Sequence, residues 1–133
     1  MLVRIPGTYN PFMDTIISDI LSQDSKMGTP AVDVAEFDNH YEIVSELPGL
    51  KREDIKISLE DGSLTLSGER KPYAFPEGTA ILRQETSKEP FARSFTVPDG
   101  IDSNSITAEL KDGILRIQLP KTERIRAKEI SIR

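Results

Sequence analysis

The side chains best suited to catalysis are a single histidine, His40, and the carboxylates close to it in the chain. Asp38 lies two positions before His40, and together with a serine these residue types could form a nucleophilic triad. However, the sequence contains no G-x-S-x-G elbow to present such a serine, and a lone loop histidine is usually solvated. We therefore predict that His40 has no catalytic role.

Other signatures of reaction chemistry are also absent from the sequence. There is no cysteine, which excludes disulfides, thiolate catalysis and cysteine metal sites. No H-E-x-x-H, P-loop or G-x-G-x-x-G pattern occurs, and metal-ligating residues are not clustered. The carboxylate pair Glu60-Asp61 flanks a predicted turn, where aspartate serves the backbone. We predict a protein that is not an enzyme and holds neither metal nor cofactor.

Length and composition point to one globular domain. The chain has 133 residues, of which 37% are hydrophobic and 29% charged. Its net charge of −5 argues against nucleic acid as the main partner, because phosphate binding requires a basic face. The sequence shows neither a secretory signal pattern nor a long apolar run, so we expect a cytoplasmic protein that requires no membrane.

The segment Ile106–Lys121 predicts a β-hairpin. Apolar residues alternate on each side of Asp112-Gly113, and this dipeptide readily adopts the positive φ angles of a tight turn. Pro120 cannot donate to a ladder and should end the second strand. Asp61-Gly62 repeats the pattern earlier in the chain, which we interpret as a second, independent hairpin.

Period-two alternation continues from residue 32 almost to the end of the chain. About seven or eight short strands separated by turn residues predict an all-β, immunoglobulin-like sandwich. The remaining predicted strands begin at Val32, include Tyr41–Leu47, Ile55–Leu59 and Leu64–Gly68, continue at Phe91–Val97, and end with Ile130–Ile132.

Residues 1–30 differ from the sandwich and predict an N-terminal arm. Asn10 and Pro11 suit the start of a short helix, and the linker 23–30 is polar with Gly28 and Pro30. This helix either packs on its own domain or serves as a mobile adhesive arm. Its apolar face comprises Phe12, Met13, Ile16, Ile17, Ile20 and Leu21.

Residues 69–90 separate two predicted strands by an unusually long loop. Loops of this length commonly have a function, and Ala80–Gln84 could form a strand that pairs with its own sheet or with a neighbour. After the loop, alternation places Arg93 on the same face as Phe91 and Phe95. A charge on an apolar face needs a partner, for which Glu85 is a candidate.

Four segments together resemble the small heat-shock proteins of the α-crystallin superfamily, in their bacterial, archaeal and plant form. Residues 108–115 (AELKDGIL) resemble the family's A-x-x-x-(N/D)-G-hydrophobic-L signature, and residues 91–98 (FARSFTVP) resemble F-x-R-x-F-x-(L/V)-P. Residues 46–49 (ELPG) are similar to the family's strand exit, and Ile130-Ser131-Ile132 to its C-terminal I-x-I motif. The resemblance covers residues 31–132.

This resemblance implies an N-terminal arm (1–30), an α-crystallin domain (31–120) and a C-terminal extension (121–133). It also implies a dimer formed by exchange of the strand in the long loop, with Thr86 and Glu89 departing from the usual pattern. The implied dimer contacts are Ile81, Leu82, Glu85 and Arg93, with Arg93 pairing with Glu85 across the dimer.

The basic end 121–128 (KTERIRAK) is expected to be a solvated tail rather than a nucleic-acid patch.

The family further implies that Ile130 and Ile132 insert into a groove on a neighbouring dimer. Alternation places both side chains on one face of an extended strand, which suits docking at a sheet edge. The residues that would line the groove are Ile55, Ile57, Leu59, Ile106, Ala108 and Leu110.

The function implied is an ATP-independent holdase chaperone, a homo-oligomer that binds unfolding proteins and prevents their aggregation. The N-terminal arm and the grooves would supply the client-binding surface. A monomeric sandwich-type co-chaperone is the alternative. A carbohydrate-binding or hydrolytic sandwich has little support, because there is no tryptophan and 6% of residues are aromatic.

Overall fold

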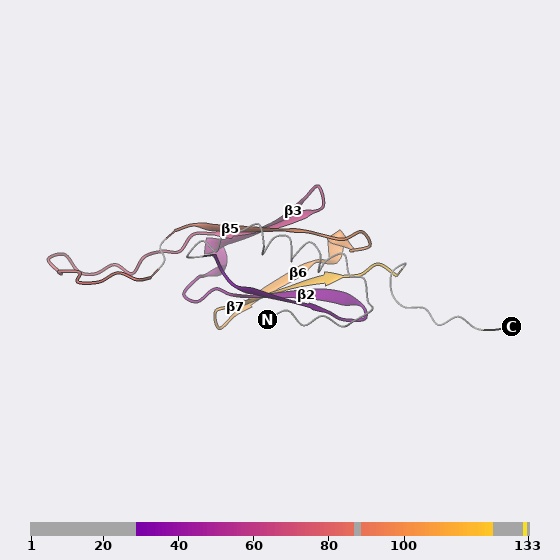
Figure 1. Cartoon of the computed structure of the whole chain (residues 1–133), viewed down its shortest axis with the longest axis horizontal. Coiled ribbons are helices and arrows are strands. Elements are labelled where there is room, and N and C mark those ends of the chain that lie inside the picture. Colours follow the sequence, from indigo (N-terminus) through magenta and orange to yellow (C-terminus); the bar gives the residue numbers. More distant parts are fainter. Residues whose placement is uncertain (1–28, 87–88, 124–131, 133) are drawn as a thin grey trace.

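The computed structural model describes residues 29–86, 89–123 and 132. The predicted apolar face of the N-terminal arm (Phe12, Met13, Ile16, Ile17, Ile20 and Leu21) and residue Ile130 of the tail motif lie outside this part of the chain. The described residues form a two-layered β-sandwich from which one long loop projects (Figure 1). This architecture confirms the predicted all-β sandwich.

Both layers are antiparallel sheets. The larger sheet has four strands in the order β1-β2-β7-β6, and the smaller has three in the order β3-β4-β5. A strand at the end of each order has one unpaired side within these sheets. The bounds are β1 (Val32–Glu36), β2 (His40–Glu46), β3 (Ile55–Glu60), β4 (Ser63–Gly68), β5 (Phe91–Thr96), β6 (Thr107–Lys111) and β7 (Ile114–Pro120), with 3₁₀ turns η1 (Arg52–Asp54) and η2 (Ser103–Ser105).

Two Asp-Gly turns connect the predicted hairpins. Asp61 and Gly62 have φ angles of 50° and 73°, and Asp112 and Gly113 have φ angles of 52° and 77°. Positive φ at both central residues is the geometry that matches the twist of antiparallel strands. The first hairpin is β3–β4 in the smaller sheet and the second is β6–β7 in the larger sheet, so each contributes to a different layer.

Side-chain alternation fills the space between the layers. In β5 every second residue is buried, starting at Phe91, and in β7 the buried residues are Leu115, Ile117 and Leu119. Full burial of such a side chain contributes roughly 1.5–3 kcal/mol. The buried apolar core consists of Tyr41, Ile43, Leu47, Leu50, Leu64, Leu66, Phe91, Phe95, Leu115, Ile117 and Leu119.

Some predicted strand limits differ by one residue. Ile106 precedes β6 and caps η2, whereas Leu47 and Val97 follow the ends of β2 and β5. Residues 80–84, which could have formed a strand, take no strand pairing within the described chain. These residues are exposed on the projecting loop, away from both sheets of their own sandwich (Figure 1).

Candidate interaction surfaces

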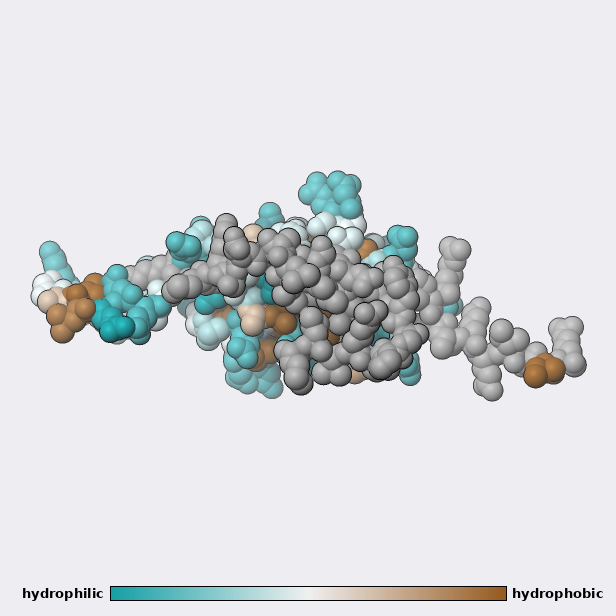
Figure 2. Space-filling view, in the orientation of Figure 1, coloured by the Kyte–Doolittle hydropathy of each residue, from teal (hydrophilic) through white to brown (hydrophobic). Residues whose placement is uncertain are grey.

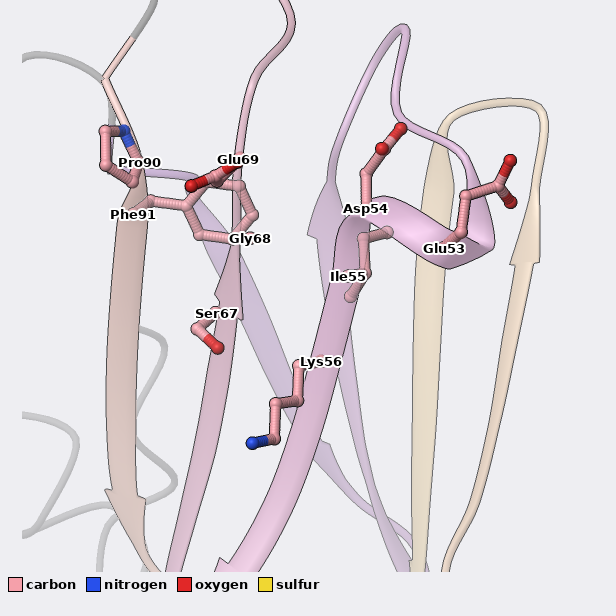
Figure 3. Close-up of a pocket in the computed structure, with 9 residues that line it drawn as sticks. All are labelled: Glu53, Asp54, Ile55, Lys56, Ser67, Gly68, Glu69, Pro90 and Phe91. Carbon is pink, nitrogen blue, oxygen red and sulfur yellow. The ribbon is translucent and has the colours of Figure 1, made fainter.

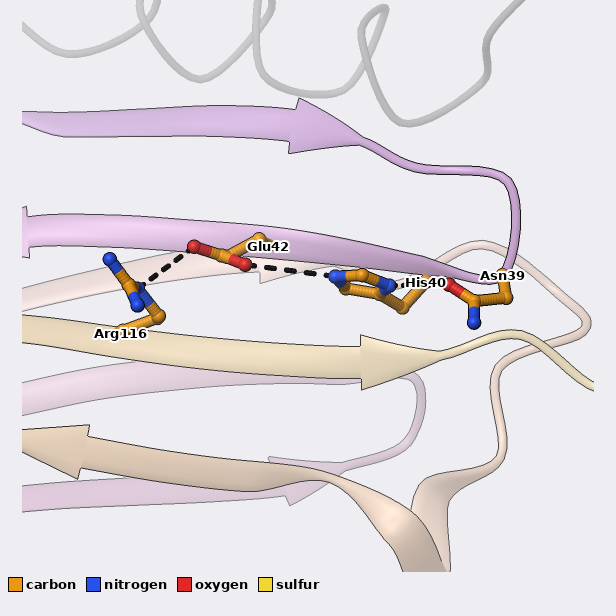
Figure 4. Close-up of polar contacts among 4 residues, drawn as sticks. All are labelled: Asn39, His40, Glu42 and Arg116. Carbon is orange, nitrogen blue, oxygen red and sulfur yellow. Dashed lines mark hydrogen bonds and ion pairs between the residues drawn. The ribbon is translucent and has the colours of Figure 1, made fainter.

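His40 belongs to a row of polar side chains across β2 and β7 (Figure 4). Its Nδ1 lies 2.6 Å from Asn39 Oδ1, and its Nε2 lies 3.6 Å from Glu42 Oε2. The other oxygen of Glu42 accepts from Arg116 Nε at 2.9 Å, and the His40 ring stacks on Phe37. His40 is therefore half-buried at the start of a strand rather than solvated in a loop, and its ring contacts Asn39, Glu42 and Phe37.

The long loop carries a concentration of exposed apolar side chains. Leu82 is 95% exposed and Tyr73 is 77% exposed, and the Tyr73 and Phe75 rings pack edge-to-face at 5.0 Å. Ile81, at 49% exposure, lies beside Leu82 in the chain. Figure 2 shows hydrophobic residues at the far end of this loop, separated from the body of the sandwich. Large apolar side chains held away from their own core mark an interaction surface.

The structure of one chain does not bring Glu85 and Arg93 together. The carboxylate of Glu85 accepts from Arg83, at 2.8 Å from Nη2 and 2.9 Å from Nε. Arg93 is buried on the apolar face of β5 as predicted, its Nη1 donates to the carbonyl of Pro30 at 3.0 Å, and its guanidinium lies 5.3 Å from the centre of the Phe95 ring.

Five of the six residues of the expected docking groove lie on two edge strands, and Ile106 directly precedes one of them. β3 ends the smaller sheet and β6 ends the larger, so both have an unpaired side within the described sheets. Four of the six residues are half-buried and pack against the core, whereas Leu59 and Ala108 are exposed. The four half-buried residues are Ile55, Ile57, Ile106 and Leu110.

The long loop leaves the sandwich through a tight crossing at η1. A Cβ atom on Gly68 would lie 2.7 Å from the Asp54 carbonyl oxygen and 2.7 Å from Phe91 Cζ, so only glycine fits there without a shift. Glu69 N donates to the Asp54 carbonyl at 3.3 Å. Figure 3 shows the Phe91 ring crossing toward Gly68. Both residues line an open pocket of about 390 Å³.

An ion pair reinforces this crossing. Asp54 Oδ2 accepts from the Lys51 backbone N–H at 3.0 Å, and its Oδ1 pairs with Lys71 Nζ at 3.0 Å. These two contacts lower the pKa of the Asp54 carboxyl below its usual range, and the hydrogen bond from Lys51 N–H has a larger effect than the contact with Lys71. Lys71 lies on the outgoing limb of the loop, so this pair ties that limb to η1.

Lys121 was expected in a solvated tail, and this expectation was wrong. Its side chain is buried, because alternation along β7 continues through Leu115, Ile117 and Leu119 to Lys121. The same alternation that identified Arg93 could have identified Lys121. The Lys121 ammonium lies over the ring of Tyr41. Burial of Tyr41, followed by its hydrogen bond and charge interaction with Glu36, raises the pKa of Tyr41 to about 12.

The described residues contain no group of three or more potential metal ligands and no helix long and apolar enough to cross a membrane. What they do contain is a sandwich with apolar side chains on its edge strands and on a projecting loop. Apolar side chains in these positions are available for contact with other chains.

Comparison with known proteins identifies the family. The family model described as Hsp20/alpha crystallin family matches residues 33–133. The chain therefore belongs to the Hsp20/alpha-crystallin family, the small heat-shock proteins, as its four sequence signatures indicated. Members of this family are non-enzymatic and are generally chaperones that bind clients and form oligomers.

Curated relatives and solved structures agree with this assignment. A 17.3 kDa class II heat shock protein of Solanum peruvianum is 36% identical over 87% of this chain and 78% of its own length. Small heat shock protein C4 of Rickettsia felis is 31% identical over 96% of this chain and 80% of its own. A crystal structure of a small heat-shock protein from Xylella fastidiosa superposes with a TM-score of 0.67 at 31% identity, covering 80% of this chain and 98% of that one.

The contacts of Asp54 predict a pH-dependent stability. Because the pKa of Asp54 is lowered on folding, its stabilising contribution is present above the unfolded pKa of about 4 and is lost as pH falls through the folded pKa. At pH 7 we expect Asp54→Asn to unfold at a lower urea concentration than the parent chain. The two midpoints should converge as the pH is lowered from about 5 to 3.

The matched control is Glu60→Gln, which neutralises an exposed carboxylate at the other end of β3. Its midpoint should differ little from the parent at any pH. A difference between parent and Asp54→Asn that stays constant from pH 7 to pH 3 would contradict the stabilising role given to the ionised Asp54.

Proposed function

We propose that this protein is an ATP-independent holdase, which binds unfolding proteins in the cytoplasm and keeps them from aggregating. The observation that carries the proposal is a family fold whose edge strands β3 and β6 leave apolar side chains exposed or half-buried, among them Ile57, Leu59 and Leu110. Apolar surface exposed by a folded protein matches the apolar segments that an unfolding client exposes. Such binding requires no reaction and no nucleotide.

The N-terminal arm is proposed as the main client-binding segment. Its apolar residues Phe12, Met13, Ile16, Ile17, Ile20 and Leu21 recur at helical spacing. Pro30 and Ala31 contact the sandwich, because their carbonyls accept hydrogen bonds from Arg93 and Ser45. A truncation that tests the arm should therefore keep Pro30 and Ala31 so that the domain stays intact.

Removal of residues 1–28 is expected to abolish suppression of heat-induced aggregation of a model client, measured by light scattering. The truncated chain should remain folded, as judged by circular dichroism, since both contacts of residues 30 and 31 are retained. A full-length chain with Asp14→Asn and Asp19→Asn, which keeps the apolar residues, is the control and should still protect. Undiminished protection by the truncated chain would refute the role given to the arm.

The projecting loop is proposed to exchange between two chains, forming a dimer. Residues 80–84 are exposed and belong to neither sheet, and β1 ends its sheet with an unpaired side that could accept another strand. In this dimer Ile81 and Leu82 would be covered, and Glu85 of one chain would exchange its Arg83 contact for Arg93 of the other. A carboxylate at a buried guanidinium would offset the cost of burying that charge.

Glu85→Ala is expected to weaken the dimer, raising its Kd by about tenfold or more, because a buried charge loses its partner. Dimer dissociation is best measured by native mass on dilution, with Ile130 and Ile132 replaced by alanine so that larger assemblies do not interfere. Glu77→Ala removes an exposed carboxylate from the same loop and should leave the Kd unchanged. Equal Kd values for both variants would exclude the Glu85–Arg93 pair.

The C-terminal extension is proposed to join dimers into larger homo-oligomers by docking Ile130 and Ile132 between β3 and β6 of a neighbouring chain. Ile132 is 98% exposed, and the residues on β3 and β6 are half-buried or exposed. Burying an isoleucine contributes roughly 1.5–3 kcal/mol, so two such side chains provide attachment that remains reversible.

Replacing both Ile130 and Ile132 by alanine is expected to reduce large particles to dimers on size-exclusion chromatography. Ile125→Ala, in the same extension but outside the motif, should leave the particle size unchanged. Particles of unaltered size in the double variant would refute tail docking.

The alternative, a monomeric sandwich-type co-chaperone, has less support because the exposed side chains on the loop and edge strands would then remain uncovered. Native mass distinguishes the two functions, since a co-chaperone of this kind would be a monomer at micromolar concentration.

A further inference from the structure

Lys121 is a buried lysine at the point where β7 gives way to the C-terminal extension. Its side chain is 8% exposed. Lysine is almost never fully buried unless it is paired, because removing an ammonium from water is costly. The end of a strand does not require a buried ammonium, because an apolar side chain would fill the same position without the cost of removing a charge from water. The placement of Lys121 therefore calls for a specific explanation.

The main chain around Lys121 is held from both sides. On one side, Asp102 N donates to Pro120 O at 2.8 Å and Thr122 N donates to Gly100 O at 2.7 Å. On the other side, Lys121 N donates to Asn39 O at 2.8 Å. Residues 120–122 thus lie between the turn that joins β1 to β2 and the segment that precedes η2.

The side chain of Lys121 adds a third attachment, directed at the end of β1. Its Nζ donates to the Phe37 carbonyl at 3.0 Å and lies 3.6 Å from Glu36 Oε1. The ammonium also lies 4.8 Å from the centre of the Tyr41 ring, within the range of a cation–π interaction. A carbonyl, a carboxylate and an aromatic face together compensate for the burial of the charge.

We propose that Lys121 is a positioning residue that fixes the root of the C-terminal extension. The extension then leaves the sandwich at Thr122 in a fixed direction. The eight residues that follow Thr122, up to Ile130, span at most about 29 Å. The inference rests on the proposed docking of Ile130 and Ile132, for which it supplies the geometry. Fixing the origin and direction of the extension selects which neighbouring chains the two isoleucines can reach.

Loss of this attachment would change the reach of the motif. Each residue released from the root adds about 3.3–3.6 Å to the extended length of the extension. Release also removes the fixed direction of departure, so that one chain could dock on neighbours in several relative positions. The expected consequence is a mixture of particle sizes in place of a narrow distribution, with the dimer itself intact.

The test compares Lys121→Met with Lys51→Met in the full chain. Methionine keeps the apolar stem but removes the ammonium, and Lys51 is an exposed lysine outside both edge strands of the proposed docking groove. Amide hydrogen exchange at positions 121 and 122 should be about tenfold faster or more in Lys121→Met, because a charge-assisted hydrogen bond is lost. Native mass should show a broader distribution of particles for Lys121→Met and an unchanged one for Lys51→Met.

Exchange in β4, in the centre of the smaller sheet, reports global folding in the same sample. Faster exchange at positions 121 and 122 with β4 unchanged, together with broadened mass, supports the proposal. Unchanged exchange at positions 121 and 122 overturns it. Faster exchange throughout, β4 included, also overturns it, because Lys121 would then stabilise the whole fold rather than position the extension.

Failure of the underlying docking would be recognised separately. If alanine at Ile130 and Ile132 leaves the particle size unchanged, tail docking itself is refuted, whatever Lys121→Met does to hydrogen exchange. If docking holds, adding Lys121→Met to the double alanine variant should still accelerate exchange at positions 121 and 122 without changing the mass further. A further change in mass in that triple variant would count against the proposal.

Discussion

An open two-sheet sandwich necessarily ends in unpaired strand edges, and this constraint underlies the other features of the molecule. With three strands in one layer and four in the other, β1, β6, β3 and β5 each terminate a sheet. Exposed edges invite pairing with other chains, and natural proteins cover, charge or interrupt them. Here the sandwich has a projecting loop and terminal extensions, which are segments able to cover the edges of a neighbouring copy in the proposed assembly.

The structure anchors such segments where they leave the sandwich. At the root of the loop, Gly68 permits a close approach to Asp54 that no side chain would allow, and Lys71 pairs with the same aspartate. At the root of the C-terminal extension, Lys121 contacts Phe37 and Glu36. Each anchor places a charged side chain where the chain changes from sheet to extension, although the two anchors share no sequence pattern.

Local signals made most of the fold predictable from the sequence. Side-chain alternation and Asp-Gly turns depend on neighbouring residues alone. The sequence therefore predicted the hairpins β3–β4 and β6–β7 correctly, and it placed Arg93 on the buried face of its strand. The burial of Lys121 was not predicted, because the charged composition of residues 121–128 is typical of a solvated tail. The alternation of β7 nevertheless continues into Lys121. The contacts of Gly68 and Asp54 join segments distant in the chain, which no local pattern can reveal.

The fixed origins of the loop and of the C-terminal extension complement the weak contacts that these segments are proposed to make with other chains. Half-buried apolar side chains such as Ile57 and Leu110 keep part of their area on their own core, so a docking segment can cover only the remainder. In the proposed assembly each contact with another chain is therefore modest, and its reversibility would follow from its size. A segment whose origin is fixed meets its site at a high effective concentration, so that several modest contacts made together can hold an assembly that any one of them could not.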